Sequence, residues 1–432
     1  MHNTADLNPM IERALLLGAE TPKTKRPEAK ALLEELEELV ANLGIGVVGK
    51  EIAKARDPNP ALLFGKGKVQ EILDLAVKLK ADSIIFDEPL SPAQQRNWDR
   101  EAGGKLLIID RQEIILDIFN SRAATKEASL QVELARLEYE LPRMKRAWTH
   151  LDRQRGGGAV QRDAGETQLE MDQRMIRGRI SKLKKELVEV VRHRDTQRKR
   201  RMKVPLPSAA IVGYTNAGKS SLLNLLSDAD VMAEDKLFAT LDPTTRRMDL
   251  PSGQTLLLTD TVGFIRRLPH RLVEAFKATL EEAIVSTFLI HLIDASSPDA
   301  EAHYATTMKV LTELNAEKKD ILVVFNKIDM VSDPTRLAIL KSEYPDCLFV
   351  SVKSGEGIED LLTRCEKKLE SFARPMVLLI PHERYDVINR LHEAGAISSK
   401  EITDEGVLIK GNIPNRLVEG VEEYHTKAIA YQ

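Results

Sequence analysis

The chain has 432 residues, of which 43% are hydrophobic and 30% charged, and a formal net charge of only −3; this length predicts two to four domains, each with its own core. Its two cysteines lie in apolar segments, which favours a reduced compartment over a disulfide framework. The sequence contains no run of eighteen apolar residues and no signal-peptide pattern over residues 1–20, so we expect a cytoplasmic protein without an obligate membrane partner.

Residues 1–124 alternate between helical periodicity and short apolar runs. Helices that alternate with buried strands are typical of a small parallel α/β domain. The expected helices cover 29–43, 69–79 and 93–101, and the expected strands cover 45–49, 83–86 and 106–110. The string Gly65–Lys68 at a helix start could bind a phosphate, although a capped surface turn explains it more simply.

Residues 125–203 carry two apolar stripes at alternating steps of four and three residues, which predicts an antiparallel helical hairpin. The stripes are Leu130, Leu134, Leu137, Leu141 and Met144, and then Ile176, Ile180, Leu183, Leu187 and Val190. Within this region, residues 142–203 contain 19 Lys and Arg against 8 Asp and Glu, a charge of +11 that leaves −14 for the rest of the chain.

The tip between the two stripes, 151–167, has no core pattern and combines glycines with arginines. A solvated linker would satisfy this composition, but guanidinium groups beside glycines suit close approach to structured phosphates. We therefore expect RNA contact through shape and phosphates, since no motif for reading a DNA groove is present. The candidate contacts are Arg153, Arg155, Gly156, Gly157, Gly158 and Arg162, and Trp148 could stack on a base.

Residues 213–220 read Gly-Tyr-Thr-Asn-Ala-Gly-Lys-Ser, which fits the phosphate-loop pattern G-x-x-x-x-G-K-[ST]. Apolar runs at 209–212 and 222–226 supply the strand before it and the helix after it. In such a loop backbone N–H groups surround the phosphates, Lys219 reaches the β- and γ-phosphates, and the Ser220 hydroxyl binds Mg²⁺.

Three further motifs follow, each directly after an apolar strand: Asp260–Gly263, Asn326–Asp329 and Ser351–Lys353. Asp260 is placed to hold Mg²⁺ through water, and Gly263 to donate its N–H to a γ-phosphate. Asp329 can accept from both the ring N–H and the exocyclic amine of guanine, whereas adenine would leave this carboxylate unpaired. Four motifs in this order predict a GTP-binding domain at 204–374.

The expected nucleotide contacts are the members of these motifs together with part of the first switch segment. They are Gly213, Tyr214, Thr215, Asn216, Ala217, Gly218, Lys219, Ser220, Ser221, Phe238, Ala239, Thr240, Leu241, Asp242, Asp260, Thr261, Val262, Gly263, Asn326, Lys327, Ile328, Asp329, Ser351, Val352 and Lys353. A hydroxyl of the first switch should reach Mg²⁺, and spacing leaves Thr240, Thr244 and Thr245 as alternatives.

Two residues bear on hydrolysis. Phe264 stands near the position where many GTP hydrolases carry a water-orienting glutamine, and its ring cannot hydrogen-bond water. We therefore expect slow intrinsic hydrolysis. Asn216 could hold a monovalent cation such as K⁺ against the phosphates, although it could equally be an ordinary turn residue.

Residues 375–432 alternate again, with strands expected at 377–380 and 407–409 and helices at 384–391 and 416–424. This pattern predicts a small C-terminal α+β domain without a visible catalytic cluster. The expected fold class is therefore α/β: a P-loop GTPase domain with an N-terminal α/β domain, an antiparallel helical hairpin and a C-terminal α+β domain.

Several strings resemble the HflX family, ribosome-associated GTPases of the Obg-HflX-like translation-factor group. They are Phe64–Lys68, Arg155–Gly158, Gly165–Glu170, Gly213–Ser220, Phe238–Asp242, Asp260–Arg266 and Leu268–His270. The family's last motif is Ser-Ala-Lys, and this chain has Ser-Val-Lys at 351–353.

The resemblance implies a GTPase that contacts the large ribosomal subunit and its RNA through the tip, Gly156 to Gly165. We expect a monomer that binds GTP and GDP. The resemblance also implies splitting of stalled or idle ribosomes under stress, and it assigns the switch Mg²⁺ ligand to Thr240. The alternative is a GTP-gated RNA-binding or anti-association factor in which hydrolysis only times release.

Overall fold

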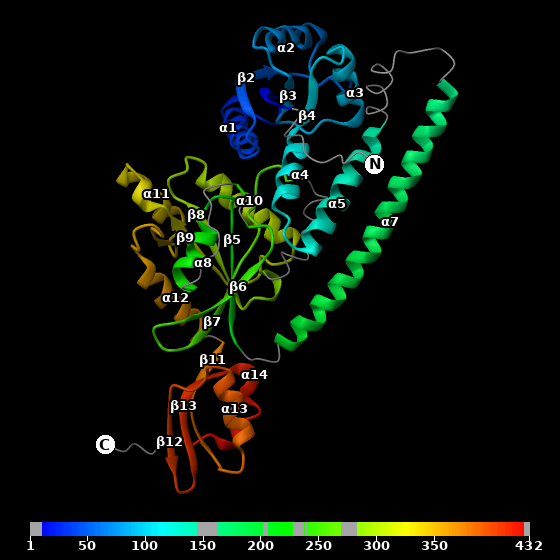
Figure 1. Ribbon diagram of the computed structural model, residues 1–432. Coiled ribbons are helices and arrows are strands. Elements are labelled where there is room, and N and C mark those ends of the chain that lie inside the picture. Colours follow the sequence, from blue (N-terminus) through cyan, green and yellow to red (C-terminus); the bar gives the residue numbers. More distant parts are fainter. Residues whose placement is uncertain are drawn as a thin grey trace. The chain divides into compact units, whose positions relative to one another are not determined.

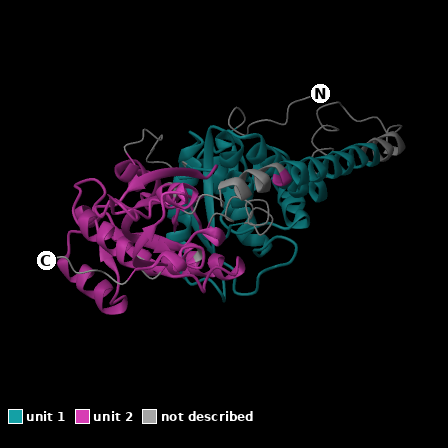
Figure 2. Cartoon of the chain, turned by 90° about the horizontal axis from the view of Figure 1, so that it is seen from below, with its two compact units in different colours: residues 1–190, 236–241, 266–276 teal, residues 191–235, 242–265, 277–432 magenta. Residues whose placement is uncertain are grey.

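The structure is a computed structural model that describes residues 11–144, 162–201, 206–227, 237–238, 240–268, 283–370 and 372–426. The chain forms two compact units (Figure 2). The first comprises residues 1–190, 236–241 and 266–276, and the second comprises 191–235, 242–265 and 277–432. Within the described ranges, no helix is long and apolar enough to cross a membrane.

The first unit begins with a four-stranded parallel sheet of order β2-β1-β3-β4 (Figure 1). Its strands are β1 (Arg13–Glu20), β2 (Gly46–Lys54), β3 (Ser83–Phe86) and β4 (Leu107–Asp110). Its helices are α1 (Arg26–Asn42), α2 (Lys66–Lys78), α3 (Pro92–Glu101) and α4 (Arg111–Arg122). The parallel α/β prediction is confirmed, but the inner strand β1 was not predicted. Residues 14–18 are buried without alternation, and such a short run has no period that distinguishes a strand from a helix.

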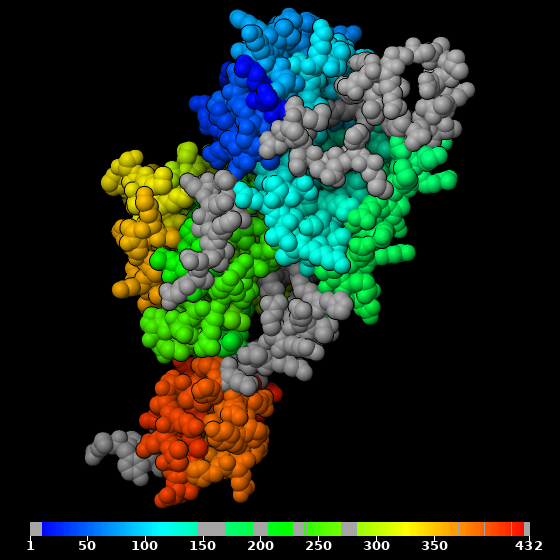
Figure 3. Space-filling model, in the orientation of Figure 1, coloured from blue at the N-terminus to red at the C-terminus, as the bar shows by residue number. Residues whose placement is uncertain are grey.

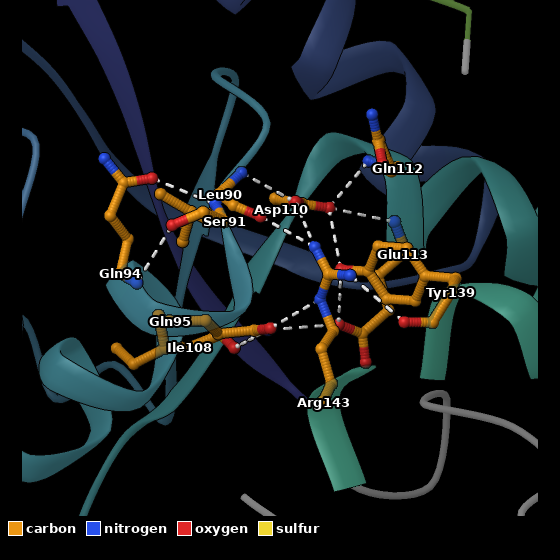
Figure 4. A network of polar contacts seen from close by, with 10 residues as sticks. All are labelled: Leu90, Ser91, Gln94, Gln95, Ile108, Asp110, Gln112, Glu113, Tyr139 and Arg143. Atoms are coloured by element: carbon orange, nitrogen blue, oxygen red, sulfur yellow. Dashed lines mark hydrogen bonds and ion pairs between the residues drawn. The ribbon is translucent and has the colours of Figure 1, made fainter. Parts of the chain in front are cut away.

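A polar network holds the end of α5 (Lys126–Glu140) to this sheet (Figure 4). Asp110 at the end of β4 is fully buried and accepts hydrogen bonds from the Tyr139 hydroxyl and the Leu90 amide. The Arg143 guanidinium donates to Gln95 Oε1 at 2.9 Å and to the Leu90 carbonyl at 2.7 Å. The C-terminal end of α5, which is the end next to the tip, is therefore anchored by residues of β4, α3 and the loop between β3 and α3.

The helical hairpin consists of α5 and α7 (Arg162–Arg201), which run in opposite directions (Figure 1). Glu133 of α5 pairs with Arg179 of α7 through two hydrogen bonds of 2.7 and 2.8 Å, and Leu183 is completely buried. The predicted start of the second helix was too late, because residues 162–167 of the expected tip loop are already helical. This stretch reads Arg-Asp-Ala-Gly-Glu-Thr, which has no apolar stripe to mark a helix, although Ala, Arg and Glu are good helix formers.

The second unit contains a six-stranded sheet of order β10-β9-β8-β5-β7-β6, in which only β6 is antiparallel to its neighbour. Its strands are β5 (Ser208–Gly213), β6 (Thr244–Asp249), β7 (Thr255–Asp260), β8 (Phe288–Asp294), β9 (Ile321–Asn326) and β10 (Leu348–Phe349). Its described helices are α8 (Lys219–Ser227), α10 (Ala300–Glu313), α11 (Pro334–Glu343) and α12 (Ile358–Glu370). Residues of α8 and α12 share one apolar cluster with the sheet, and residues of α10 share another.

A three-stranded antiparallel sheet of order β11-β13-β12 ends the second unit. Its elements are β11 (Ala373–Ile380), α13 (Tyr385–Glu393), β12 (Ser399–Thr403), β13 (Gly406–Pro414) and α14 (Asn415–Val418). The expected helix over 416–424 was too long, since α14 ends before Gly420 and a 3₁₀ turn follows at Glu422–Tyr424. Strand β12 was missed because its side chains are almost all exposed and show no apolar alternation. At the surface these strands lie in the orange-to-red part of Figure 3.

Candidate nucleotide-binding site

The predicted phosphate loop joins the inner strand β5 to the start of α8. Lys219 is buried, and its Nζ donates to the Tyr214 carbonyl at 2.8 Å. Burial lowers the pKa of Lys219 to about 8, while Asp260 acts in the opposite direction. Gly213 has a φ of 154°, and a Cβ there would overlap the Leu292 carbonyl of β8. The loop can therefore leave the sheet in this direction only with glycine at 213.

The two predicted Mg²⁺ ligands of this unit lie together. Ser220 is in the first turn of α8, which follows β5 and the phosphate loop, and Asp260 ends β7. Strands β5 and β7 are parallel neighbours, so their carboxyl ends lie at the same edge of the sheet. The Ser220 hydroxyl donates to Asp260 Oδ2 at 2.6 Å, and Asp260 is completely buried. Thr261 donates its hydroxyl to the Ile211 carbonyl at 2.7 Å, which ties the start of this motif to β5.

The segment after Asp260 runs directly beside the phosphate loop. The Thr215 amide donates to the Phe264 carbonyl at 2.7 Å, and the Phe264 amide donates to the Gly213 carbonyl at 3.1 Å. A Cβ on Gly263 would lie 2.8 Å from Thr215 Cα and 3.0 Å from Lys219 Nζ. The phenyl ring of Phe264 is only 1% exposed and packs in the core near α10. Its ring therefore points into the protein.

Asn326 joins the phosphate loop to the two predicted base-contacting motifs. Its Nδ2 donates to the Ala217 carbonyl at 2.9 Å, and its Oδ1 accepts from the Val352 amide at 3.1 Å. Asp329, an exposed residue in the turn after β9, accepts from the Ser351 hydroxyl at 2.7 Å. Three motifs that are distant in the sequence are thus linked through side chains.

The first switch segment is described only in part. Phe238, Thr240 and Leu241 belong to the first unit, where the Phe238 ring lies 4.6 Å from that of Phe119 in α4. Ala239 lies outside the described residues. Of the other threonines considered for Mg²⁺, Thr244 begins β6 and the Thr245 hydroxyl lies 2.9 Å from that of Thr259.

Two arginines after Phe264 make contacts that the sequence did not predict. Residues 266–276 belong to the first unit, where Arg266 Nε donates to Glu35 at 3.0 Å and Arg267 Nη1 donates to Asp87 Oδ2 at 2.6 Å. Buried Arg111 pairs with the same two carboxylates. Asp87 follows an apolar strand, as Asp260 does, and that signal could have identified it.

Two more residues near the site were also missed. Asp294, at the end of β8, forms an ion pair with Lys327, with 2.8 Å between Asp294 Oδ2 and Lys327 Nζ. Lys327 adopts a left-handed conformation with φ 62°. His303 of α10 stacks on the ring of Tyr214. Asp294 ends a buried apolar run, which is a readable signal, whereas no sequence pattern predicts the His303 stack.

The predicted RNA contacts lie mostly outside the described residues. This applies to Arg153, Arg155 and Gly156–Gly158, while Arg162 is the first residue of α7. The described part of α7 exposes a series of basic residues, and side chains of this helix project from the surface in Figure 3. They are Arg174, Arg177, Arg179, Lys182, Lys184, Lys185 and Arg192.

Family models match three consecutive regions of the chain. Residues 30–120 match the N-terminal region of GTP-binding GTPases, and residues 122–201 match their middle region. Residues 208–327 match a family described as 50S ribosome-binding GTPase. A crystal structure of SsGBP with GDP is 28% identical and covers 83% of this chain and 98% of that one, with a TM-score of 0.47.

Curated relatives match almost the whole chain. GTPase HflX of Akkermansia muciniphila is 50% identical over 426 residues, covering 96% of this chain and 97% of that protein. GTPase HflX of Escherichia coli is 40% identical over 375 residues and covers 87% of each chain. These matches support GTP hydrolase activity and the P-loop fold. The chain belongs to the HflX family of GTPases.

Proposed function

We propose that this GTPase binds GTP and Mg²⁺ through the loop at 213–220 and separates ribosomal subunits in its GTP-bound form. In the nucleotide site, Lys219 would turn from the Tyr214 carbonyl towards the β- and γ-phosphates. The Ser220 hydroxyl and Asp260 carboxylate lie within 2.6 Å of each other, and such oxygen donors fit Mg²⁺. Ser220 would bind the ion directly, Asp260 through water, and Thr240 would complete the set from the first switch.

Guanine selection falls to Asp329. One of its oxygens accepts from the Ser351 hydroxyl at 2.7 Å, which orients the carboxylate. Such a carboxylate can accept two hydrogen bonds from guanine and would be left unpaired beside adenine.

Slow hydrolysis in isolation follows from the position of Phe264. The phenyl ring of Phe264 is buried in the core and has no hydrogen-bonding group. This side chain therefore cannot orient the attacking water. The missing contribution would come from the ribosome, with a monovalent cation at Asn216 as an additional source of positive charge. Asn216 is exposed and left-handed, with φ 60°, so its side chain is accessible to solvent ions.

The observation that supports a ribosomal partner is the exposed basic surface of α7, continuous in sequence with the Gly/Arg tip. Seven exposed Lys and Arg on one described helix segment give a surface suited to RNA phosphates. Glu133 and Glu138 of α5 pair with Arg179 and Lys184 of α7. We infer that the large ribosomal subunit is the target and that the tip enters it.

The decisive experiment follows light scattering of purified, preformed ribosomes mixed with the protein. A fall in scattering with GTP, and with a non-hydrolysable analogue, is expected if binding of the GTP form separates the subunits. If the protein only prevents free subunits from joining, preformed ribosomes will remain intact, and the anti-association alternative is correct.

A variant of the tip tests the RNA contact separately. Replacing Arg153, Arg155 and Arg162 by Ala should weaken ribosome binding and reduce its salt dependence, by about 0.7 per lost contact for single-strand behaviour. GTP affinity should be unchanged. A matched control replaces Arg246, Lys309 and Lys341, basic residues of the second unit, by Ala. If both variants bind ribosomes with equal affinity, the tip arginines do not contact RNA and the tip is only a linker.

A further inference from the structure

Two ring stacks connect α10 to the phosphate-loop side of the sheet. The rings of Tyr214 and His303 are nearly parallel, at 13°, with centroids 3.8 Å apart. The next residue of α10, Tyr304, stacks at 16° on His291 of β8 with centroids 5.0 Å apart. One helical turn thus holds an aromatic ring from the loop and another from the sheet.

The backbone of Tyr214 contacts several other parts of the phosphate loop and its neighbouring segment. Its carbonyl accepts from Lys219 Nζ at 2.8 Å and from the Ala217 amide at 3.3 Å. Its backbone also pairs in parallel with Phe264, next to the Gly263 motif. The Tyr214 side chain is 5% exposed, so its ring has a fixed position. Any shift of Tyr214 would move the lysine and two loop segments together.

His303 is held independently of the loop. It lies in the first turn of the 14-residue helix α10, and its amide donates to the Asp299 carbonyl at 2.9 Å. Helix α10 packs against β5 and β8 and buries Val310 and Leu311 in the core. The imidazole is therefore presented by a rigid element, as a positioning group requires.

We propose that His303 is a positioning residue for phosphate binding, acting through Tyr214. By stacking on Tyr214, it holds the backbone of the phosphate loop in place, so less order has to be acquired when a nucleotide binds. This inference rests on the proposed function of the loop at 213–220. His303 itself does not touch the nucleotide in this scheme.

The test measures affinity and release of a fluorescent GDP analogue by the full-length protein. An aromatic stack contributes about 0.5–1.5 kcal/mol, so His303→Ala should weaken binding about threefold to tenfold, mainly through faster release. His303→Phe retains a stacking ring and should restore wild-type binding. His392→Ala, an exposed histidine on α13, is the control and should have no effect. Failure of His303→Phe to restore binding would overturn the proposal.

A double-mutant cycle shows whether the effect passes through Tyr214. If it does, His303→Ala should add nothing to Tyr214→Ala, because the stack is already absent. Additive effects would mean that His303 acts elsewhere. Thermal unfolding of each variant shows whether the domain remains folded.

Lys219→Ala separates failure of this inference from failure of the proposed site. If Lys219→Ala abolishes binding while His303→Ala leaves it unchanged, the site stands and His303 serves only packing. If Lys219→Ala binds as well as wild type, the loop is not the phosphate site, and the role of His303 is rejected with it.

Discussion

Arg267 Nη1 lies 2.6 Å from Asp87 Oδ2, and this ion pair joins the segment after the Gly263 motif to the carboxyl end of β3. Arg267 also contacts Glu88 at 2.9 Å and Thr24 at 3.1 Å. It adopts a left-handed conformation with φ 58°, which is unfavourable for a residue with a Cβ. Three polar contacts from one strained residue mark this point as tightly held.

Replacing Arg267 by Ala should destabilise the first unit. The substitution leaves Asp87 buried with Arg111 as its remaining close cation, and loss of one partner of a buried pair is costly. The Arg267 side chain is 21% exposed and Arg111 still pairs with Asp87. We therefore expect the free energy of unfolding, measured by thermal or urea unfolding, to fall by about 1–3 kcal/mol. Arg267→Gly should lose about 1 kcal/mol less stability than Arg267→Ala, since glycine adopts a positive φ without strain. Arg246→Ala, on exposed β6, should change little. Equal stability of all three would show that the pair contributes nothing.

His291 should make the second unit sensitive to acid. Burial lowers its pKa to about 3, and Lys219 contributes in the same direction; neither ring nitrogen has a hydrogen-bond partner among the described residues. The unfolded chain binds a proton near pH 6.5 and the folded chain does not, so stability falls as pH drops below 6.5. At pH 5 the loss is about 2 kcal/mol relative to neutral pH.

The test compares His291→Phe with wild type at pH 7.5 and pH 5. Phe keeps a ring against Tyr304 and cannot titrate, so the loss of stability between these two pH values should shrink. A constant packing cost of the larger ring cancels in this comparison. His392→Phe on the surface is the control and should leave the pH dependence as in wild type. An unchanged dependence in His291→Phe would contradict the assignment.

Gly218→Ala should impair nucleotide binding. Gly218 has a φ of 93°, and a Cβ there would overlap Asn326 Nδ2, the atom that donates to the Ala217 carbonyl. Displacing Asn326 would separate the phosphate loop from the base-contacting motifs, so we expect at least tenfold weaker GDP binding by fluorescence titration. Gly253→Ala is a matched control, because its φ is 77° but nothing lies within 4 Å of its Cβ. Similar affinity of both variants would refute the role of this contact.

Asp329→Asn should change the base preference. An amide presents a donor where guanine requires an acceptor, so GTP should bind more weakly and xanthosine triphosphate more tightly than in wild type. Titrations with both nucleotides give the ratio. Ser351→Ala removes the hydroxyl that orients Asp329. This variant should bind GTP moderately more weakly and should not bind xanthosine triphosphate more tightly than wild type. Full GTP affinity of Asp329→Asn would show that another residue reads the base.

Local sequence was sufficient to place the motifs of the candidate nucleotide site. Strand, loop and helix at 208–227 follow from apolar runs that flank a glycine-containing loop, and Asp260 and Asn326 each end a buried strand. Since the carboxyl ends of parallel strands meet at one edge of the sheet, these motifs could be placed together before their contacts were known. The apolar stripes of α5 and α7 likewise predicted the hairpin, because helical spacing is a local property.

Tertiary structure decided what has no local period. Strand β1 is buried on both faces, so its sequence carries no alternation. Exposed β12 has a single apolar residue, Ile402, which cannot form an alternating pattern. The direction of the Phe264 ring depends on the space left beside α10. The stacking of His303 on Tyr214 and the pairing of Arg267 with Asp87 join residues 89 and 180 positions apart. A buried charge or ring needs a suitable partner. In these contacts the partner comes from a distant element, so it depends on how the elements pack and cannot be read from residue spacing.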